Sequence, residues 1–317
     1  MKKRFLIVGD NHLDSFIRVR LDNYMESSLM ELHESLRIAK AAKADYYILL
    51  GDVFNRITVG GECRNRAIDI LSGDNGEPWP FEKYVVVGNH DIAYNPLYIG
   101  KSDLQTLISA EVVKCVDRLE ELPVSFHHFT GDLDKQLKEG TVLPHMPDKI
   151  MFLHASITDK PSLFDHILFK DLNLHPSTKI VCSGHIHAPM EATHKSGAKF
   201  FNPGSLGRTK EDESHDPQVL LLQYDFETDE YQHKYLRLKS SLSHDIIFDV
   251  DRNRQRRIED KNTELFISTI TDISLADTIS GDAETDFKTF AKKRNANENV
   301  IKVVVDTIDI IKTGGTI

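Results

Sequence analysis

Five short apolar segments of this chain each lead directly into glycine, aspartate, asparagine or histidine. The predicted strands are residues 4–9, 46–50, 83–87, 150–154 and 179–183. Apolar runs of this length, rich in β-branched residues and stopped by polar side chains, are typical of buried strands that carry functional groups at their carboxyl ends. If these ends meet at one edge of a sheet, their polar side chains form one pocket.

The polar residues at these strand ends are candidate metal ligands. In chain order they are Asp10, His12, Asp52, Asn89, His154, His185 and His187. Carboxylate, amide and imidazole donors without any thiolate suit two divalent ions such as Mn²⁺, Fe²⁺ or Zn²⁺ better than a structural zinc site. If each of two ions has four protein ligands, one carboxylate is shared. Asp52 is the natural bridge, because it stands alone after its strand.

Two neighbours of these candidates have predicted catalytic roles. Pairs of metal ions about 3.5–4 Å apart activate a water and hold the attacking and leaving oxygens of a phosphoryl displacement. His90, next to Asn89, is then free to act on the leaving oxygen, and Asp91 is available to orient His90. The sequence therefore predicts hydrolysis of a phosphoester.

The segments between the predicted strands indicate a mixed fold. Apolar residues recur at a nearly helical period in places, and the predicted helices are residues 25–43, 62–72, 101–108 and 161–170. Residues 111–149 show a weaker pattern, which we interpret as edge strands and a loop over the site. A strand at 199–205 and a hairpin of residues 218–225 and 231–238 follow. This order predicts an α/β sandwich of mixed sheets with helices outside.

A boundary near residue 240 is expected to divide the chain into a catalytic domain, 1–240, and a small C-terminal extension, 241–317. The extension contains a basic cluster, which we interpret as a helix face or linker, with DNA binding as the alternative. The cluster consists of Arg252, Arg254, Arg256 and Arg257. Residues 300–311 place isoleucine and valine on one helical stripe. Packing against its own core and docking of a partner both explain that stripe.

Charge and composition limit the class of protein. A net charge of −10, from 39 Lys and Arg against 49 Asp and Glu, argues against non-specific electrostatic binding of nucleic acid. Bound cations reverse the local sign, so the charge counts against a nuclease without excluding one. Three cysteines are too few for a disulfide framework. No apolar run approaches the roughly 18 residues of a membrane span, and we expect a cytoplasmic protein that binds no membrane.

The motifs Asp-x-His, Gly-Asp, Gly-Asn-His-Asp, His and Gly-His-x-His occur in this order, each at a strand end. This ordered set resembles the calcineurin-like metallophosphoesterase superfamily over residues 4–240. The resemblance implies a four-layer sandwich of two mixed β-sheets flanked by helices, with two divalent metal ions. It implies that one ion is held by Asp10, His12, Asp52 and His187. It implies that the other is held by Asp52, Asn89, His154 and His185, and that His90 is catalytic.

Further elements resemble one group within that superfamily. Residues 88–91 end in aspartate, whereas protein serine/threonine phosphatases have Gly-Asn-His-Glu. The Gly-Asp-Val-Phe element at 51–54 and the element at 201–208 look like those of SbcD-type DNA repair and recombination nucleases, including phage versions. That group implies manganese-dependent exonuclease or endonuclease activity on DNA, an SMC-like ATPase partner of the SbcC type, and a capping domain, and it allows a homodimer. Asn55 departs from the pattern, because many relatives have His or Asp there.

Two other functions stay open. A small-molecule or nucleotide phosphodiesterase or phosphatase is consistent with the acidic net charge. A protein-binding module that keeps the fold without chemistry is the third interpretation, although every ligand position is filled. Arg208 and Lys210 are candidate contacts to a phosphate backbone.

Overall fold

The computed structural model describes residues 1–92, 99–163 and 165–249, together with isolated positions in the C-terminal segment. The chain divides into two compact units, Met1–Asp249 and Val250–Ile317. The predicted arginine cluster lies outside the described residues, as does most of the predicted stripe at 300–311. The partner-binding role of the C-terminal extension therefore stays a prediction.

The first unit contains two five-stranded sheets. The strands of the first sheet, in spatial order, are β14 (Tyr231–Arg237), β13 (Gln218–Asp225), β1 (Lys2–Val8), β2 (Tyr46–Leu49) and β5 (Glu82–Val85). β1, β2 and β5 run parallel, whereas β13 pairs antiparallel with β1 and with β14. This sheet is therefore mixed, and the hairpin predicted from the sequence is confirmed.

The second sheet is also mixed. Its strands, in spatial order, are β11 (Met190–Thr193), β12 (Lys199–Asn202), β10 (Ile180–Gly184), β7 (Ile150–His154) and β6 (Val124–His127). Only β11 runs antiparallel to its neighbour. Two short ladders complete the strands that the structure describes. They are β3 (Gly73–Asp74) with β4 (Glu77–Pro78), and β8 (Ile157–Thr158) with β9 (Ile167–Leu168).

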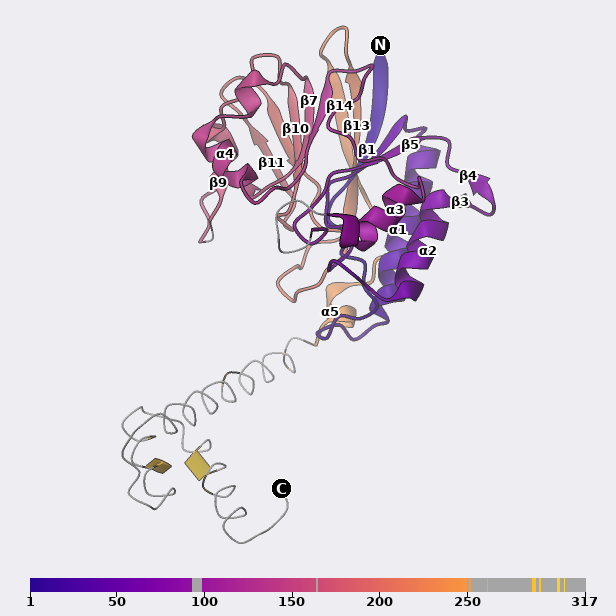
Figure 1. Cartoon of the computed structure of the whole chain (residues 1–317), viewed down its shortest axis with the longest axis vertical. Coiled ribbons are helices and arrows are strands. Elements are labelled where there is room, and N and C mark those ends of the chain that lie inside the picture. The colour runs from indigo at the N-terminus through magenta and orange to yellow at the C-terminus, as the bar shows by residue number, and fades with distance from the viewer. Residues whose placement is uncertain are drawn as a thin grey trace. The chain divides into compact units, whose positions relative to one another are not determined.

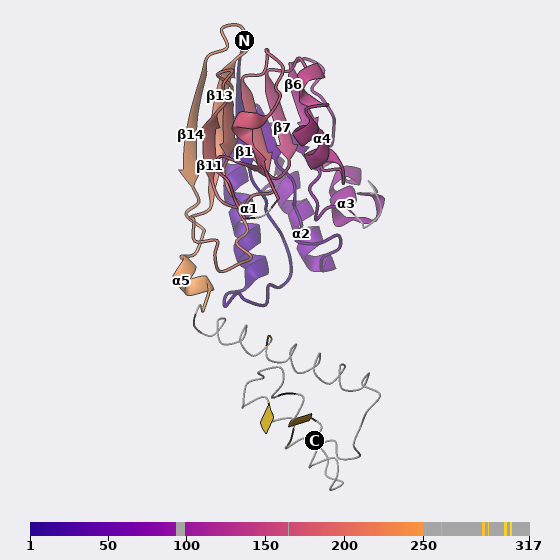
Figure 2. The same ribbon diagram turned by 90° about the vertical axis from the view of Figure 1, so that its left-hand side faces the viewer.

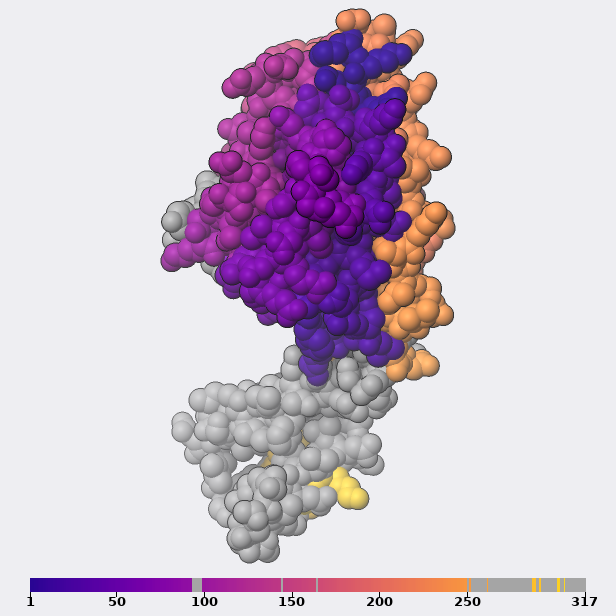
Figure 3. Space-filling view, turned by 90° about the vertical axis from the view of Figure 1, so that its right-hand side faces the viewer, coloured from indigo at the N-terminus to yellow at the C-terminus, as the bar shows by residue number. Residues whose placement is uncertain are grey.

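Helices cover the outer faces of both sheets, so the layers run helix, sheet, sheet, helix (Figures 1 and 2). The α-helices are α1 (Tyr24–Ala41), α2 (Gly61–Ser72), α3 (Asp103–Ser109), α4 (Leu133–Glu139) and α5 (His244–Ile247). The 3₁₀ turns are η1 (Ile99–Lys101), η2 (Leu143–His145) and η3 (Phe169–Asp171). In Figure 3, the face built from the first part of the chain is bordered along one edge by the orange segment that contains β13, β14 and α5. None of the helices in the described part is long and apolar enough to cross a membrane.

The strand β1 shows why its sequence is apolar without alternation. Phe5 and Ile7 are fully buried in the core between the two sheets. Leu6 and Val8 are fully buried in the core that also contains Leu36 of α1. A strand with both faces covered in this way needs apolar side chains at consecutive positions. The predicted sandwich with outer helices is therefore confirmed.

One prediction about the connecting segments is wrong, and another is incomplete. Residues 161–170 do not form a helix, because Ile167 pairs with Ile157 in a short ladder and only a single 3₁₀ turn follows. Short apolar runs do not distinguish a strand from a helix by their period. Residues 111–149 contain the predicted edge strand, β6, but also the helix α4, whose Leu133 and Leu137 pack in the core under the second sheet.

Glu31 of α1 provides a pH-dependent test of the fold. Burial raises the pKa of Glu31 to about 7, because a hydrogen bond to Ser241 and the charge of Arg208 offset only part of the desolvation. The folded state therefore holds this proton more tightly than the unfolded chain. The free energy of unfolding falls as pH rises from the ordinary pKa of glutamate to about 7. We expect Glu31→Gln to raise the free energy of unfolding at pH 8 by about 1–3 kcal/mol. Below pH 5 the difference should be small.

Denaturant unfolding at pH 5 and pH 8 measures this effect. Glu34→Gln on the same helix is the matched control, because hydrogen bonds to Ser240 and to the Lys239 amide outweigh burial and lower the pKa of Glu34. That substitution should destabilise the protein at pH 8. A Glu31→Gln protein that is no more stable than wild type at pH 8 would contradict the prediction.

Candidate dinuclear metal site

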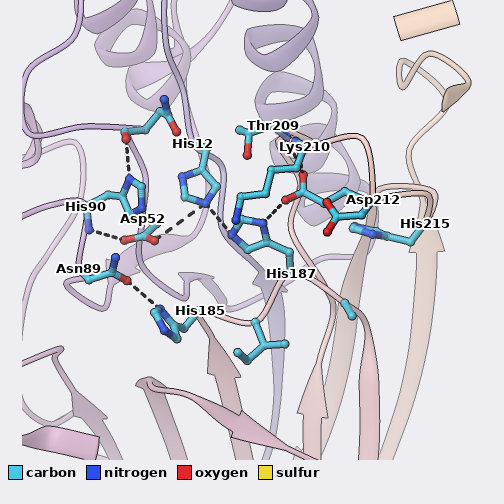
Figure 4. A pocket seen from close by; sticks show the side chains of 14 residues that line it. His12, Asp52, Asn89, His90, His185, His187, Thr209, Lys210, Asp212 and His215 are labelled. Carbon is cyan, nitrogen blue, oxygen red and sulfur yellow. Dashed lines mark hydrogen bonds and ion pairs between the residues drawn. The ribbon is translucent and has the colours of Figure 1, made fainter. Parts of the chain in front are cut away.

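The carboxyl ends of five strands meet at one end of the sandwich. β1, β2 and β5 are parallel neighbours in one sheet, and β7 and β10 are parallel neighbours in the other. The predicted ligands lie at or just after these ends, and they are Asp10, His12, Asp52, Asn89, His154, His185 and His187. Figure 4 shows five of them around one cavity. The structure thus brings all seven side chains together, while their role as ligands stays a prediction.

Glycines let the strand ends approach this closely. A Cβ atom at Gly88 would lie 2.1 Å from Asp52 Oδ1, and one at Gly184 would lie 2.5 Å from Asp10 Oδ1. Gly51 has a φ of +108°, and its Cβ would lie 2.3 Å from His154 Nδ1. Each glycine directly precedes a predicted ligand. The absence of a side chain at the glycine leaves room for a second predicted ligand from another strand.

One half of the site gathers around His187. The Nε2 atoms of His12 and His187 are 2.9 Å apart. His187 Nε2 lies 3.6 Å from Asp10 Oδ2, and His12 Nε2 lies 3.9 Å from Asp52 Oδ2. Asp10, His12 and Asp52 are almost fully buried. These are the four side chains predicted to hold the first ion.

The other half gathers around His154. Its Nδ1 donates to the Leu50 carbonyl at 2.8 Å, which links the two sheets. His154 Nε2 lies 2.9 Å from Asn89 Oδ1 and 3.5 Å from Asp52 Oδ2. His185 Nδ1 lies 2.7 Å from the same Asn89 oxygen. These are the four side chains predicted to hold the second ion, and Asp52 contacts both halves.

The donor chemistry of the site fits bound cations. The His154 Nδ1–H donates a hydrogen bond to the Leu50 carbonyl, so Nε2 faces the oxygens of Asn89 and Asp52 either with a proton or, in the neutral ring, with the lone pair that binds a cation. The His187 Nδ1–H likewise donates to Glu213, so in the neutral ring the lone pair lies on Nε2, beside Asp10. Acceptors that face one another in a buried space are destabilising unless a cation or proton lies between them. Mixed oxygen and imidazole donors suit divalent transition metals.

His90 and Asp91 lie next to this cluster. The His90 amide donates to Asp52 Oδ1 at 2.8 Å, and its ring Nδ1 contacts the Asn55 carbonyl. Asp91 is buried, accepts from the Gly88 amide at 2.9 Å, and has its pKa raised to about 8 by burial and by the charge of Asp52. The His90 ring is therefore oriented by a hydrogen bond that its Nδ1 donates to the Asn55 carbonyl, while Asp91 holds the turn. The catalytic roles of both residues stay predictions.

Sequence reasoning missed two carboxylates beside the site. Glu213, 6% exposed, accepts from His187 Nδ1. Asp14, 1% exposed, accepts from Asn55 Nδ2 at 3.0 Å and from Arg56 at 2.7 Å. Asp14 follows His12 by two residues, so its spacing could have suggested it. Glu213 lies in an acidic loop without a recognisable motif.

The two candidate phosphate contacts differ in exposure. Arg208 is 1% exposed and donates to Ser241 Oγ at 2.9 Å, so it supports the fold and cannot reach a substrate. Lys210 is exposed and lines the cavity in Figure 4. The cavity has a volume of about 520 Å³, and Lys210 is the only lysine or arginine among its lining residues in the described chain.

The sequence profile of the calcineurin-like phosphoesterases matches residues 3–189, which is more than half of the chain and includes every predicted ligand. The chain belongs to the calcineurin-like phosphoesterase family. Membership supports a metal-dependent phosphoester hydrolase, and the resemblance at superfamily level is confirmed. The cluster of His and Asp side chains supports two divalent metals.

Two solved structures are similar to this calcineurin-like phosphoesterase. A dimetal phosphatase from Danio rerio is 13% identical, with a TM-score of 0.40 over 74% of this chain and 98% of that chain. A single mutant of Vps29 from Entamoeba histolytica is 13% identical, with a TM-score of 0.29 over 74% of this chain and 99% of that chain. At these values neither likeness bears on function. No curated protein matches the chain.

Proposed function

We propose that this phosphoesterase is the manganese-dependent nuclease subunit of a DNA repair or recombination complex, with an SMC-like ATPase of the SbcC type as partner. The observation that carries hydrolysis is the complete ligand set around Asp52. The nuclease assignment is supported by the elements at 51–54 and 201–208, which both border the site. Leu206 donates its amide to the Asp10 carbonyl at 2.8 Å.

The ligands, His90 and Asp52 have different roles in the proposed hydrolysis. Two divalent cations held by the seven ligands would supply Lewis-acid activation of water and neutralise phosphate charge. The Asn55 carbonyl accepts from Nδ1–H and fixes the His90 ring, so the doubly protonated ring directs its second N–H, on Nε2, at the leaving oxygen and becomes neutral when that proton is transferred. The Asp52 carboxylate also holds the His90 amide, so the catalytic histidine and the central ligand keep a fixed relative position.

Lys210 supports a substrate with more than one phosphate. In Figure 4, Lys210 and His90 lie on opposite sides of His12. A lysine at that place contacts a phosphate next to the one being cleaved, which is how positioning contacts to a nucleic acid backbone usually work. A polynucleotide offers such a phosphate, whereas a simple phosphomonoester does not.

A small-molecule or nucleotide phosphodiesterase is the second candidate. A cavity of 520 Å³ lies within the range of about 300–1,000 Å³ that is usual for small-ligand sites. Asp212 in the cavity wall and the net charge of −10 also disfavour a long polyanion. The third candidate is a protein-binding module without chemistry, which the filled ligand positions disfavour.

An assay on the full-length protein with Mn²⁺ separates these candidates. The substrates are a labelled single-stranded oligonucleotide, a duplex with free ends, and bis-p-nitrophenyl phosphate, each with and without the ATPase partner. The nuclease proposal expects DNA cleavage that the partner increases. Turnover of the small diester alone under every condition would contradict it and favour the second candidate. A protein that binds no metal and hydrolyses nothing would favour the third.

A further inference from the structure

Glu213, a carboxylate on the loop after β12, contacts the predicted ligand His187. Its Oε1 accepts a hydrogen bond from Nδ1–H of His187. Its Oε2 accepts the backbone amides of Thr209 at 2.6 Å and Lys210 at 3.2 Å. Both oxygens are therefore used, and the side chain is 6% exposed. A carboxylate with this many partners keeps one orientation.

The loop that carries Glu213 is itself fixed to the framework of the fold. Ser205 donates its amide to the His187 carbonyl at 2.9 Å, and His215 Nε2 lies 3.0 Å from the Ser205 carbonyl. The buried Arg208 side chain bonds Ser241 and the Leu242 carbonyl. Glu213 is thus held in place by contacts on both sides of it in the sequence.

The two halves of the metal site differ in how their histidines are oriented. His154 donates to a backbone carbonyl at the end of a buried strand, at 2.8 Å. His187 instead donates to the carboxylate of Glu213, on a loop. A carboxylate fixes the tautomer of a ligand histidine and increases its basicity, and removal of such a partner typically costs 10–100-fold in metal affinity.

We propose that Glu213 is a positioning residue that sets the affinity of the His187 half of the site for its divalent cation. It acts by holding His187 with Nε2 directed at Asp10 and His12. This inference rests on the proposed two-metal function and deepens it. It states that Glu213 affects the binding affinity of one ion more than that of the other. Among the described residues, no hydrogen bond or ion pair joins Glu213 to the His154 half, so Glu213 acts directly on the His187 half.

Calorimetric titration of the full-length, metal-free protein with Mn²⁺ tests this inference without any substrate. Wild type is expected to bind two ions. Glu213→Leu should weaken one binding step by about 10–100-fold and leave the other unchanged. Glu213→Gln should lose less, because the amide oxygen still accepts the Nδ1 proton. Asp216→Asn is the matched control for loss of one negative charge, since Asp216 pairs with Arg237 at 2.7 Å on the surface.

A double-mutant cycle separates positioning from a general structural effect. If Glu213 acts through His187, then Glu213→Leu causes no further loss of affinity in a His187→Ala background. Additive losses, or a Glu213→Leu protein that binds both ions as wild type does, would overturn this inference alone. A wild-type protein that binds no Mn²⁺ would overturn the proposed function and this inference together. Circular dichroism of each metal-free variant shows whether it is folded.

Discussion

Replacing Asp52 by asparagine is expected to lower phosphodiester turnover by roughly 10³–10⁴-fold, the largest effect of any single substitution that we predict. Asp52 Oδ2 faces His12 at 3.9 Å in one half of the site and His154 at 3.5 Å in the other. Metal-ion stabilisation of a transition state is worth several kcal/mol, and each 1.4 kcal/mol corresponds to about tenfold in rate. Loss of the shared carboxylate therefore affects both ions.

The measurement is kcat/KM for bis-p-nitrophenyl phosphate in saturating Mn²⁺, together with the metal content of the protein after desalting. Asp165→Asn is the control, because Asp165 is a surface aspartate whose partner is Lys138. It should retain wild-type activity and metal content. An Asp52→Asn protein that keeps two ions per chain and loses less than about tenfold in kcat/KM would show that the carboxylate is not shared.

Replacing His90 by glutamine is expected to lower the cleavage of unactivated diesters by about 10²–10⁴-fold while the metal content stays at the wild-type level. The effect should depend on the leaving group. An alkoxide needs a proton as it departs, whereas p-nitrophenolate does not. The loss should therefore be large for thymidylyl-thymidine and small for the p-nitrophenyl ester of thymidine 5′-phosphate.

Rates for these two substrates, measured with the same variant, isolate proton transfer from binding. His145→Gln is a suitable control, since His145 is exposed and lies outside the cavity lining. Equal losses on both substrates would argue that His90 acts on something other than the leaving oxygen. Loss of metal from the His90→Gln protein would instead argue that His90 is a ligand, a role that its position near His12 and Asp52 allows.

The residues that follow strands directly were predictable from sequence, because the strand and the candidate ligand are specified by neighbouring residues. Asp10, Asp52 and Asn89 each follow an apolar run and a glycine, so the same few residues specify the strand, the close approach and the candidate ligand. The antiparallel hairpin of β13 and β14 was predictable for a similar reason. Its pattern is local, and its two strands are consecutive in the chain.

Contacts made through space by loops were not predictable in this way. Glu213 reaches His187 from 26 residues away, and nothing in the acidic loop distinguishes it from its neighbours. The partner of the His90 ring is a backbone carbonyl, that of Asn55, and a backbone atom has no sequence signal. Arg208 resembled a phosphate contact by residue type, but only the structure reveals its burial.

Anomalous diffraction from crystals grown with Mn²⁺ tests the central claim most directly, because it locates each ion without reference to activity. The account predicts two peaks per chain, both within bonding distance of Asp52. One should be bound by Asp10, His12 and His187, and the other by Asn89, His154 and His185. A single peak, or two peaks that do not share Asp52, would contradict it.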